Sequence, residues 1–201
     1  MNKKDFDASV QIVELSSLEN RFAFIDNQIL RQNLTVCFQY IIFLLSLEDT
    51  YHSPGAIQYS IFKNIILHTA SIAEAITSHK LQLLLKDGRV KAEEIFPHDY
   101  KYQCISELHK ISPTETICGV KRTKIYPRLN NETTMVHLNK TARTVGLFTQ
   151  AVFEKAEKLR TLRNKIHLAG LDEADDNYSK TDVEECFTAT KLIIERVQKF
   201  A

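Results

Sequence analysis

The sequence contains no tryptophan and is poor in the residues that form turns, with five glycines and four prolines among 201 residues. This scarcity argues against an all-β fold with many turns, so we expect helices to dominate. With 44% hydrophobic and 25% charged residues, the composition is that of an ordinary soluble globular protein. The chain is long enough for one sizeable domain, or for one domain with an insertion.

Targeting signals and long apolar runs are also lacking. Met1–Val10 is polar and charged and is not followed by the apolar region of a signal peptide. The richest apolar run, Tyr40–Leu45, is too short to span a bilayer. The cysteines are scattered, and no two are spaced as a metal knuckle or redox pair: Cys37, Cys104, Cys118 and Cys186. These features predict a cytoplasmic protein with reduced thiols and no membrane partner.

Apolar residues recur at helical spacing in several segments. The segments lie at about residues 20–47, 56–85, 134–145, 149–169 and 181–200. Ser53 is expected to cap the second helix, with Pro54 at its first helical position. Thr181–Glu184 fits a capping box for the last helix. Three glycines are expected to end helices: Gly88, Gly146 and Gly170.

The middle of the chain has a different pattern. Residues 101–105 and 116–126 contain β-branched and aromatic residues in partly alternating order, with Ser112-Pro113 between them. This pattern predicts a two- or three-stranded ribbon. We therefore expect a mainly α fold, an antiparallel helical bundle formed by residues 1–201 as a single domain, with a β-rich insertion at about residues 98–130.

The net charge of +1 hides a strong local asymmetry. Cys118–Arg143 holds six basic residues against one acid, and Lys155–Leu168 holds five against one. Leu171–Glu185 instead holds seven acids against one lysine. If the two basic stretches meet in space, they form a patch suited to a phosphate backbone. The candidate RNA-binding residues are Lys121, Arg122, Lys124, Arg128 and Lys165. Alternatively, each stretch is a solvated face balanced by nearby acids.

Residues 159–168 place charged and polar groups on a helix that otherwise has a buried pattern. Its apolar stripe consists of Val152, Ala156, Leu159 and Ile166. At about 100° per residue, Arg163 falls in the middle of this stripe, while Arg160 and His167 lie within about 20° of each other on its edge. An arginine that faces an apolar interior must be paired, solvated in a cleft or directed at an anion.

Arg160, six intervening residues and His167, with Arg163-Asn164 inside, resemble the signature of the HEPN superfamily. The spacing to histidine fits the family pattern when it is measured from Arg160, whereas the familiar polar neighbour follows Arg163. Both arginines are therefore candidates for the functional position. Ala169 stands where HEPN toxins regulated by a nucleotidyltransferase partner carry a tyrosine.

The resemblance implies a HEPN-like helical bundle with metal-independent endoribonuclease activity, in which two protomers face their motifs across a shared cleft. His167 would act as general base or acid on the ribose 2′-hydroxyl and the leaving oxygen. Arg160 and Arg163 would stabilise charge on the scissile phosphate, and Asn164 would orient either partner. The expected products are a cyclic phosphate and a 5′-hydroxyl end. No metal or cofactor is expected, and the chain would act in a bacterial toxin–antitoxin, phage-defence or stress system.

Other interpretations of the same residues remain open. Arg163 could pair with a carboxylate on a neighbouring helix, for example Glu74, and His167 could be a core histidine near a helix end. The chain would then be a non-catalytic HEPN-like module that binds protein or RNA. It could also be an antitoxin or immunity partner whose contact surface is the acidic Leu171–Glu185. The remaining histidines show no zinc-ligand spacing: His52, His68, His79, His98, His109 and His137.

Overall fold

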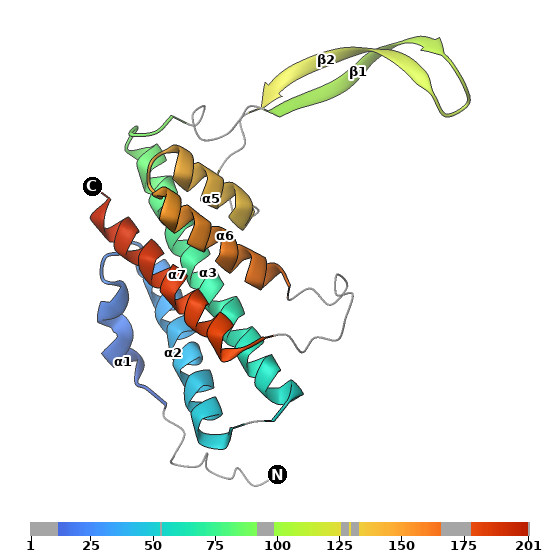
Figure 1. The fold of residues 1–201 in the computed structure, drawn as a ribbon. Coiled ribbons are helices and arrows are strands. Elements are labelled where there is room, and N and C mark those ends of the chain that lie inside the picture. Colours follow the sequence, from blue (N-terminus) through green and yellow to red (C-terminus); the bar gives the residue numbers. More distant parts are fainter. Residues whose placement is uncertain are drawn as a thin grey trace.

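The computed structural model describes residues 12–52, 54–91, 99–125, 129, 133–165 and 178–200. Within them the chain is mainly helical, with a two-stranded antiparallel sheet (Figure 1). The helices are α1 (Leu15–Leu18), the short 3-10 helix η1 (Glu19–Phe22), α2 (Gln28–Tyr51), α3 (Ala56–Lys86), α5 (Met135–Thr144), α6 (Gln150–Asn164) and α7 (Lys180–Lys199). The expected mainly α fold with a small β-ribbon is therefore confirmed at this level.

The long helices α2, α3, α6 and α7 alternate in direction along the chain (Figure 1). As a result α3 and α7 run parallel, and hydrogen bonds join them both in their middles and near their C-terminal ends. The Thr190 hydroxyl donates to the Thr69 carbonyl at 3.5 Å, and Lys80 donates to the Phe200 carbonyl at 2.7 Å. This arrangement makes α3 the central helix, since α2, α5, α6 and α7 all pack against it.

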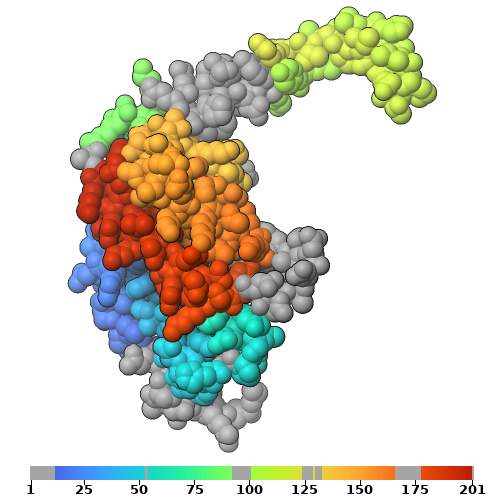
Figure 2. Space-filling view, in the orientation of Figure 1, coloured from blue at the N-terminus to red at the C-terminus, as the bar shows by residue number. Residues whose placement is uncertain are grey.

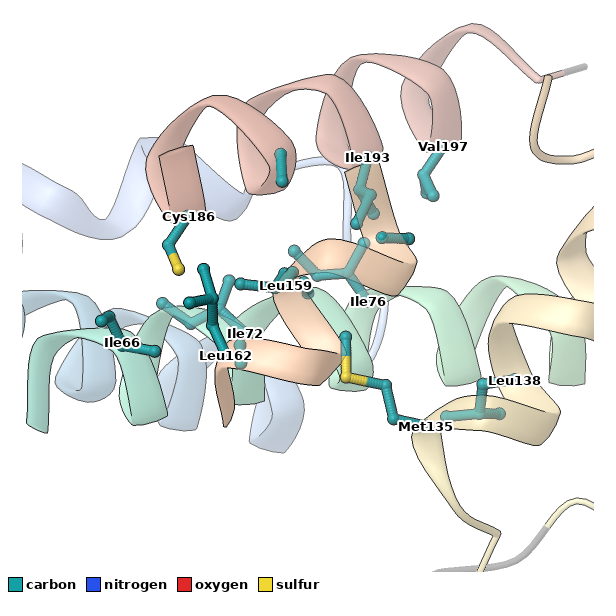
Figure 3. Packing of buried hydrophobic residues seen from close by; sticks show 14 of the residues in the cluster. Ile66, Ile72, Ile76, Met135, Leu138, Leu159, Leu162, Cys186, Ile193 and Val197 are labelled. Atoms are coloured by element: carbon teal, nitrogen blue, oxygen red, sulfur yellow. The ribbon is translucent and has the colours of Figure 1, made fainter. Parts of the chain in front are cut away.

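The core lies between α2, α3, α5, α6 and α7, and Figure 3 shows the part where the last four of these helices meet. Figure 3 shows Leu159 of α6 between Ile76 of α3 and Ile193 of α7, and all three side chains are almost fully buried. Met135 and Leu138 of α5 close the same cluster. Removing these side chains from water is the main source of stability for the bundle.

The first predicted helix is interrupted. The expectation of one helix over about residues 20–47 is wrong at its start, because α2 begins at Gln28 and the chain before it turns. The Asn27 side chain caps α2 by accepting from the Leu30 backbone N–H at 3.0 Å. Arg31 donates twice to the Ile25 carbonyl, at 2.9 and 2.6 Å, which holds the turn against the helix. Ile25 is buried without being helical, and its burial produced the misleading periodicity.

Several helix ends also differ from the prediction. Ser53 lies outside the described residues, and Pro54 precedes α3 instead of opening it, because Gly55 is the N-cap with φ of 53° and ψ of −125°. That backbone conformation favours glycine. The predicted ends of α3 and α5 are confirmed, with Gly88 and Gly146 in left-handed conformations.

The capping box of α7 lies two residues earlier than predicted. Ser179 and Asp182 form it, instead of Thr181 and Glu184. The Asp182 backbone N–H donates to the Ser179 hydroxyl at 3.2 Å, and the Ser179 backbone N–H donates to the Asp182 carboxylate at 2.8 Å. Tyr178 and Val183, which flank this cap as a hydrophobic staple, are both buried. Burial of the staple fixes where the helix starts.

The insertion forms a ribbon of two strands, β1 (Asp99–Lys110) and β2 (Thr116–Ile125). The strands are antiparallel, and register shifts interrupt the pairing after Cys104 and after Glu107. The ribbon projects away from the helices (Figures 1 and 2). Its large apolar side chains are exposed, including Tyr102, Ile105, Leu108, Ile117 and Val120.

Among the described residues, one helix is long and apolar enough to cross a membrane by length and composition alone, namely α2. Its inner face carries Leu34, Ile41 and Leu44, which are buried in the bundle. A core helix of a soluble protein passes the same test of length and composition.

Candidate functional site

The C-terminal half of α6 carries both candidate arginines. Val152, Ala156 and Leu159 of the predicted apolar stripe are buried, as expected. Leu162, which was not part of that stripe, is buried beside them, and Ile166 lies outside the described residues. The helix ends at Asn164, with Lys165 as its cap. The prediction that this helix continues to about residue 169 is wrong at Lys165, because Lys165 lies in a turn. Gly170, which was predicted to end the helix, lies outside the described residues.

Arg163 reaches across to the central helix. Its guanidinium lies 3.2 Å from the Glu74 carboxylate of α3, and the two side chains are 32% and 22% exposed. The alternative prediction that Arg163 pairs with Glu74 is thus confirmed. Burial raises the pKa of Glu74 above its ordinary value, although the nearby charge of Arg163 opposes this effect. The pair therefore ties α6 to α3 at a carboxylate that is partly removed from water.

Arg160 belongs to a second network one helical turn earlier. Its Nε and a terminal nitrogen lie 3.0 and 2.9 Å from one oxygen of Glu157, which is three residues back on α6. The other Glu157 oxygen accepts from the Asn139 side chain of α5 at 2.8 Å. Asn139 is buried. This network orients Arg160 and links α6 to α5.

Asn164 is the last residue of α6, and Lys165 is its C-cap. Asn164 and Lys165 are exposed. His167 lies outside the described residues. The structure therefore places Arg160, Arg163, Asn164 and Lys165 on the last turns of α6 and its cap, and it does not describe the fourth predicted catalytic residue.

Three of the predicted RNA-binding residues lie on β2. Lys121 and Arg122 are exposed there, opposite Gln103 and Tyr102 of β1. Lys124 pairs with Tyr100 in the strand register. Arg128 lies outside the described residues. Because the ribbon projects away from the bundle, these residues are separated from the arginines of α6 (Figure 1). Among the described residues, the basic side chains of β2 therefore form no continuous patch with those of α6.

Two features of the structure were missed at the level of sequence. Glu157 could have been found, since its spacing of three residues from Arg160 places the two on one helix face. The cysteines that sequence spacing kept apart include a cross-strand pair, Cys104 of β1 and Cys118 of β2. A hydrogen bond with Cys104 raises the pKa of the Cys118 thiol. In the strand register Cys104 lies opposite Val120, two residues from Cys118 on β2, and this pairing between the two strands is not apparent from the spacing of the cysteines in the sequence.

Chemically, the end of α6 offers two half-buried guanidinium groups and an exposed amide. An arginine fork suits a phosphate or carboxylate ligand. Among the described residues, no group of three or more histidine, cysteine, aspartate or glutamate side chains could hold a metal ion.

The chain was compared with protein-family models, with curated proteins and with solved structures, and it matches none of them.

Proposed function

We propose that the chain is a HEPN-like, metal-independent endoribonuclease whose catalytic residues lie at the C-terminal end of α6. The observation that carries this proposal is the placement of Arg160 and Arg163 one turn apart, each half-exposed and each held by a carboxylate. Asn164 follows them on the surface, and His167 comes three residues later in the sequence. The four residues are those of the HEPN-like motif.

The Glu157 and Glu74 carboxylates favour catalysis because they orient the two arginine side chains. A guanidinium has five N–H donors, and the ion pairs of Arg160 and Arg163 use only some of them. Glu157 and Glu74 fix the planes of the Arg160 and Arg163 guanidinium groups. The exposed edges of these two guanidinium groups bind the scissile phosphate and stabilise its developing charge. His167 takes the proton of the ribose 2′-hydroxyl or delivers one to the leaving oxygen. The reaction needs no metal or cofactor.

The basic residues of the ribbon would contact RNA away from the scissile bond. Lys121, Arg122 and Lys124 lie on one strand that extends from the bundle, and Arg128 follows in the sequence. Lys165 is exposed beside the arginines of α6. Contacts of this kind bind phosphates without reading sequence, so they set affinity and register.

The biological setting follows from the same resemblance. The protein would act in the cytoplasm as a homodimer, as an effector of a bacterial toxin–antitoxin, phage-defence or stress system. An antitoxin or another protein partner would restrain it. The acidic Leu171–Glu185 is the sequence segment suited to bind a basic partner or to shield the basic end of α6.

One observation favours a second function, a non-catalytic HEPN-like module that binds RNA or protein. Arg160 and Arg163 are both already paired within the chain, with Glu157 and Glu74. The Arg163–Glu74 pair joins α6 to α3, and Glu157 joins α6 to α5 through Asn139, so these contacts have a structural value without any substrate. In that case the arginines would be retained for packing.

The test is cleavage of a panel of labelled RNAs by the purified full chain in excess chelator. Wild type is compared with His167→Ala and with the Arg160→Ala/Arg163→Ala double variant. A ribonuclease of this type cleaves in chelator, and both variants lose at least about a hundred-fold in rate while remaining folded. Lys155→Ala, which removes an exposed positive charge from α6 outside the motif, is the matched control and keeps its activity.

Two outcomes would contradict the enzyme. Cleavage that is equal in wild type and variants belongs to a contaminant or to another site. If wild type does not cleave and the arginine variant loses thermal stability, the residues are structural and the binding module is the better description.

A further inference from the structure

A groove at the far end of the bundle lies outside the proposed ribonuclease site. It has a volume of about 650 Å³ and is formed where the end of α2 meets the starts of α3 and α7. In Figure 2 the first turns of α7 lie beside the cyan and teal ends of α2 and α3. Gln58, Tyr59 and Phe62 of α3 line it, and Phe62 precedes Glu74 by twelve residues, about 18 Å along the helix.

The groove is predominantly acidic. Glu48, Asp49 and Glu184 line it from α2 and α7, against one lysine, Lys180, among the described lining residues. Asp49 and Glu184 are exposed, but Glu48 is only 8% exposed. An acidic groove concentrates positively charged ligands by its field.

Glu48 is the feature that points to a ligand. Its Oε1 accepts a hydrogen bond from the Gln58 side chain at 2.5 Å. Its Oε2 is buried and has no hydrogen-bond partner in the described part of the chain. A buried carboxylate oxygen without a donor is costly, and natural proteins seldom leave one unsatisfied. A ligand with a charged N–H group would supply the missing donor.

The side chains that line the groove indicate the apolar part of the ligand. Tyr59, Phe62 and Phe187 line the groove with aromatic rings, which favour an apolar body and attract cations by their π faces. His52 closes α2 at the groove in a left-handed conformation, with φ of 43°. This conformation ends α2, since the His52 backbone N–H donates to the Glu48 carbonyl at 2.9 Å.

We propose that this groove binds a small organic cation, a primary amine or guanidino compound, whose N–H groups donate to Glu48 while its carbon chain lies against the aromatic walls. Such a ligand would contact α2, α3 and α7 together. Binding to the folded state alone raises the melting temperature as ligand concentration rises. The proposal is independent of ribonuclease activity, so either can fail without the other.

The experiment is calorimetric titration of the full chain with agmatine, putrescine, spermidine and free arginine, supported by thermal unfolding. Choline, a cation without N–H donors, is the ligand control. At least one panel member is expected to bind and choline to bind at least about ten-fold more weakly, because only N–H groups satisfy Glu48.

The key variant is Glu48→Gln, which keeps the shape of the side chain and removes its charge. It is expected to weaken binding at least about ten-fold without lowering the melting temperature, because a buried charge is removed. Asp87→Asn removes one exposed negative charge at the opposite end of α3 and is the matched control, with unchanged affinity. If Glu48→Gln does not fold, Glu184→Gln on the exposed rim provides the same comparison, with a smaller loss.

Three results would overturn the proposal. The first is no binding by any panel member up to about 10 mM, since weaker association would be negligible. The second is equal binding to wild type and to the Glu48→Gln variant, or to Glu184→Gln where that variant replaces it, which would show general attraction by surface charge. The third is choline binding as tightly as the primary amines, which would exclude N–H donation to Glu48.

Discussion

The helical bundle and the β-ribbon differ in how far their apolar side chains are exposed to solvent. In the bundle, Leu159, Ile76 and Ile193 are almost completely removed from water. In the ribbon, Ile105 and Leu108 are each 66% exposed. Both regions are rich in β-branched and aliphatic residues, so composition alone does not separate them. The difference is that each helix has neighbours on its apolar face, whereas the ribbon pairs with itself and projects into solvent.

This contrast shows which region supplies stability. An isolated two-stranded ribbon is marginally stable in water, and exposed apolar side chains on it contribute little to folding. The bundle therefore gains little stability from the ribbon, which pairs with itself. Exposed apolar groups beside Lys121 and Arg122 are suited to contacts with another molecule, which agrees with the proposed role of β2 in binding.

The largest expected difference is in thiol reactivity. Burial raises the pKa of Cys186 in α7 to about 12, so at pH 8 only about one thiol in ten thousand is ionised. Cys104 on β1 is exposed. With a thiol reagent at pH 8, Cys104 should react at least about a hundred-fold faster than Cys186, as measured by mass spectrometry of digested protein. Equal rates in the folded protein would contradict the burial of Cys186.

The next largest effect separates the two regions by stability. Leu159→Ala should lower the free energy of unfolding by about 2–5 kcal/mol, because it leaves a cavity between α3 and α7. Denaturant unfolding followed by circular dichroism measures the change. A loss below about 1 kcal/mol would show that α6 is not packed in the core.

A smaller effect is expected at the ion pair between α6 and α3. Arg163→Ala should cost about 1–2 kcal/mol, since it leaves the half-buried Glu74 without its charged partner, and partial exposure reduces the penalty. A double-mutant cycle with Glu74→Gln isolates the interaction. Additive single-variant effects would show that the two side chains do not interact in solution.

The pKa of Glu74 gives this pair a dependence on pH. Because the folded-state pKa of Glu74 is raised, the native protein binds a proton at a higher pH than the unfolded chain. Between the raised pKa of the folded state and the ordinary pKa of 4.5, the free energy of unfolding of wild type should rise relative to that of Glu74→Gln as the pH falls. Below pH 4.5 the difference should stay constant. Urea unfolding from pH 7 to 4 measures it. The opposite slope would mean that Arg163, and not burial, dominates.

The smallest effect is expected on the ribbon. Ile105→Ala should change the free energy of unfolding of the bundle by no more than about 0.5 kcal/mol, because its side chain is exposed. The measurement is the same denaturant titration as for Leu159→Ala. If the two substitutions cost similar amounts, the ribbon packs against another surface in solution and the contrast between the regions is wrong.

The sequence was sufficient for elements whose pattern is local. The helical spacing of α3 and α5 and the alternation in the ribbon predicted these elements, and the glycines at 88 and 146 end the helices where expected. Glu74 was also a predicted partner of Arg163, because an arginine on a buried stripe needs a carboxylate from a neighbouring helix.

Other features depend on tertiary context. Ile25 is buried in a turn, so it looked helical, and burial of Tyr178 moved the capping box of α7 to Ser179. The proximity of Cys104 and Cys118 depends on how β1 and β2 pair, and the groove at Glu48 forms where three chain segments meet. None of these can be inferred from the spacing of residues along one segment.

The central claim is that the end of α6 cleaves RNA by attack of the 2′-hydroxyl. It is tested most directly by identifying the ends of RNA fragments formed by the wild-type chain in excess chelator, with His167→Ala beside it. The account predicts cyclic phosphate and 5′-hydroxyl ends that are absent with the variant. Fragments with 5′-phosphate ends, or cyclic phosphate ends formed equally by the variant, would contradict it.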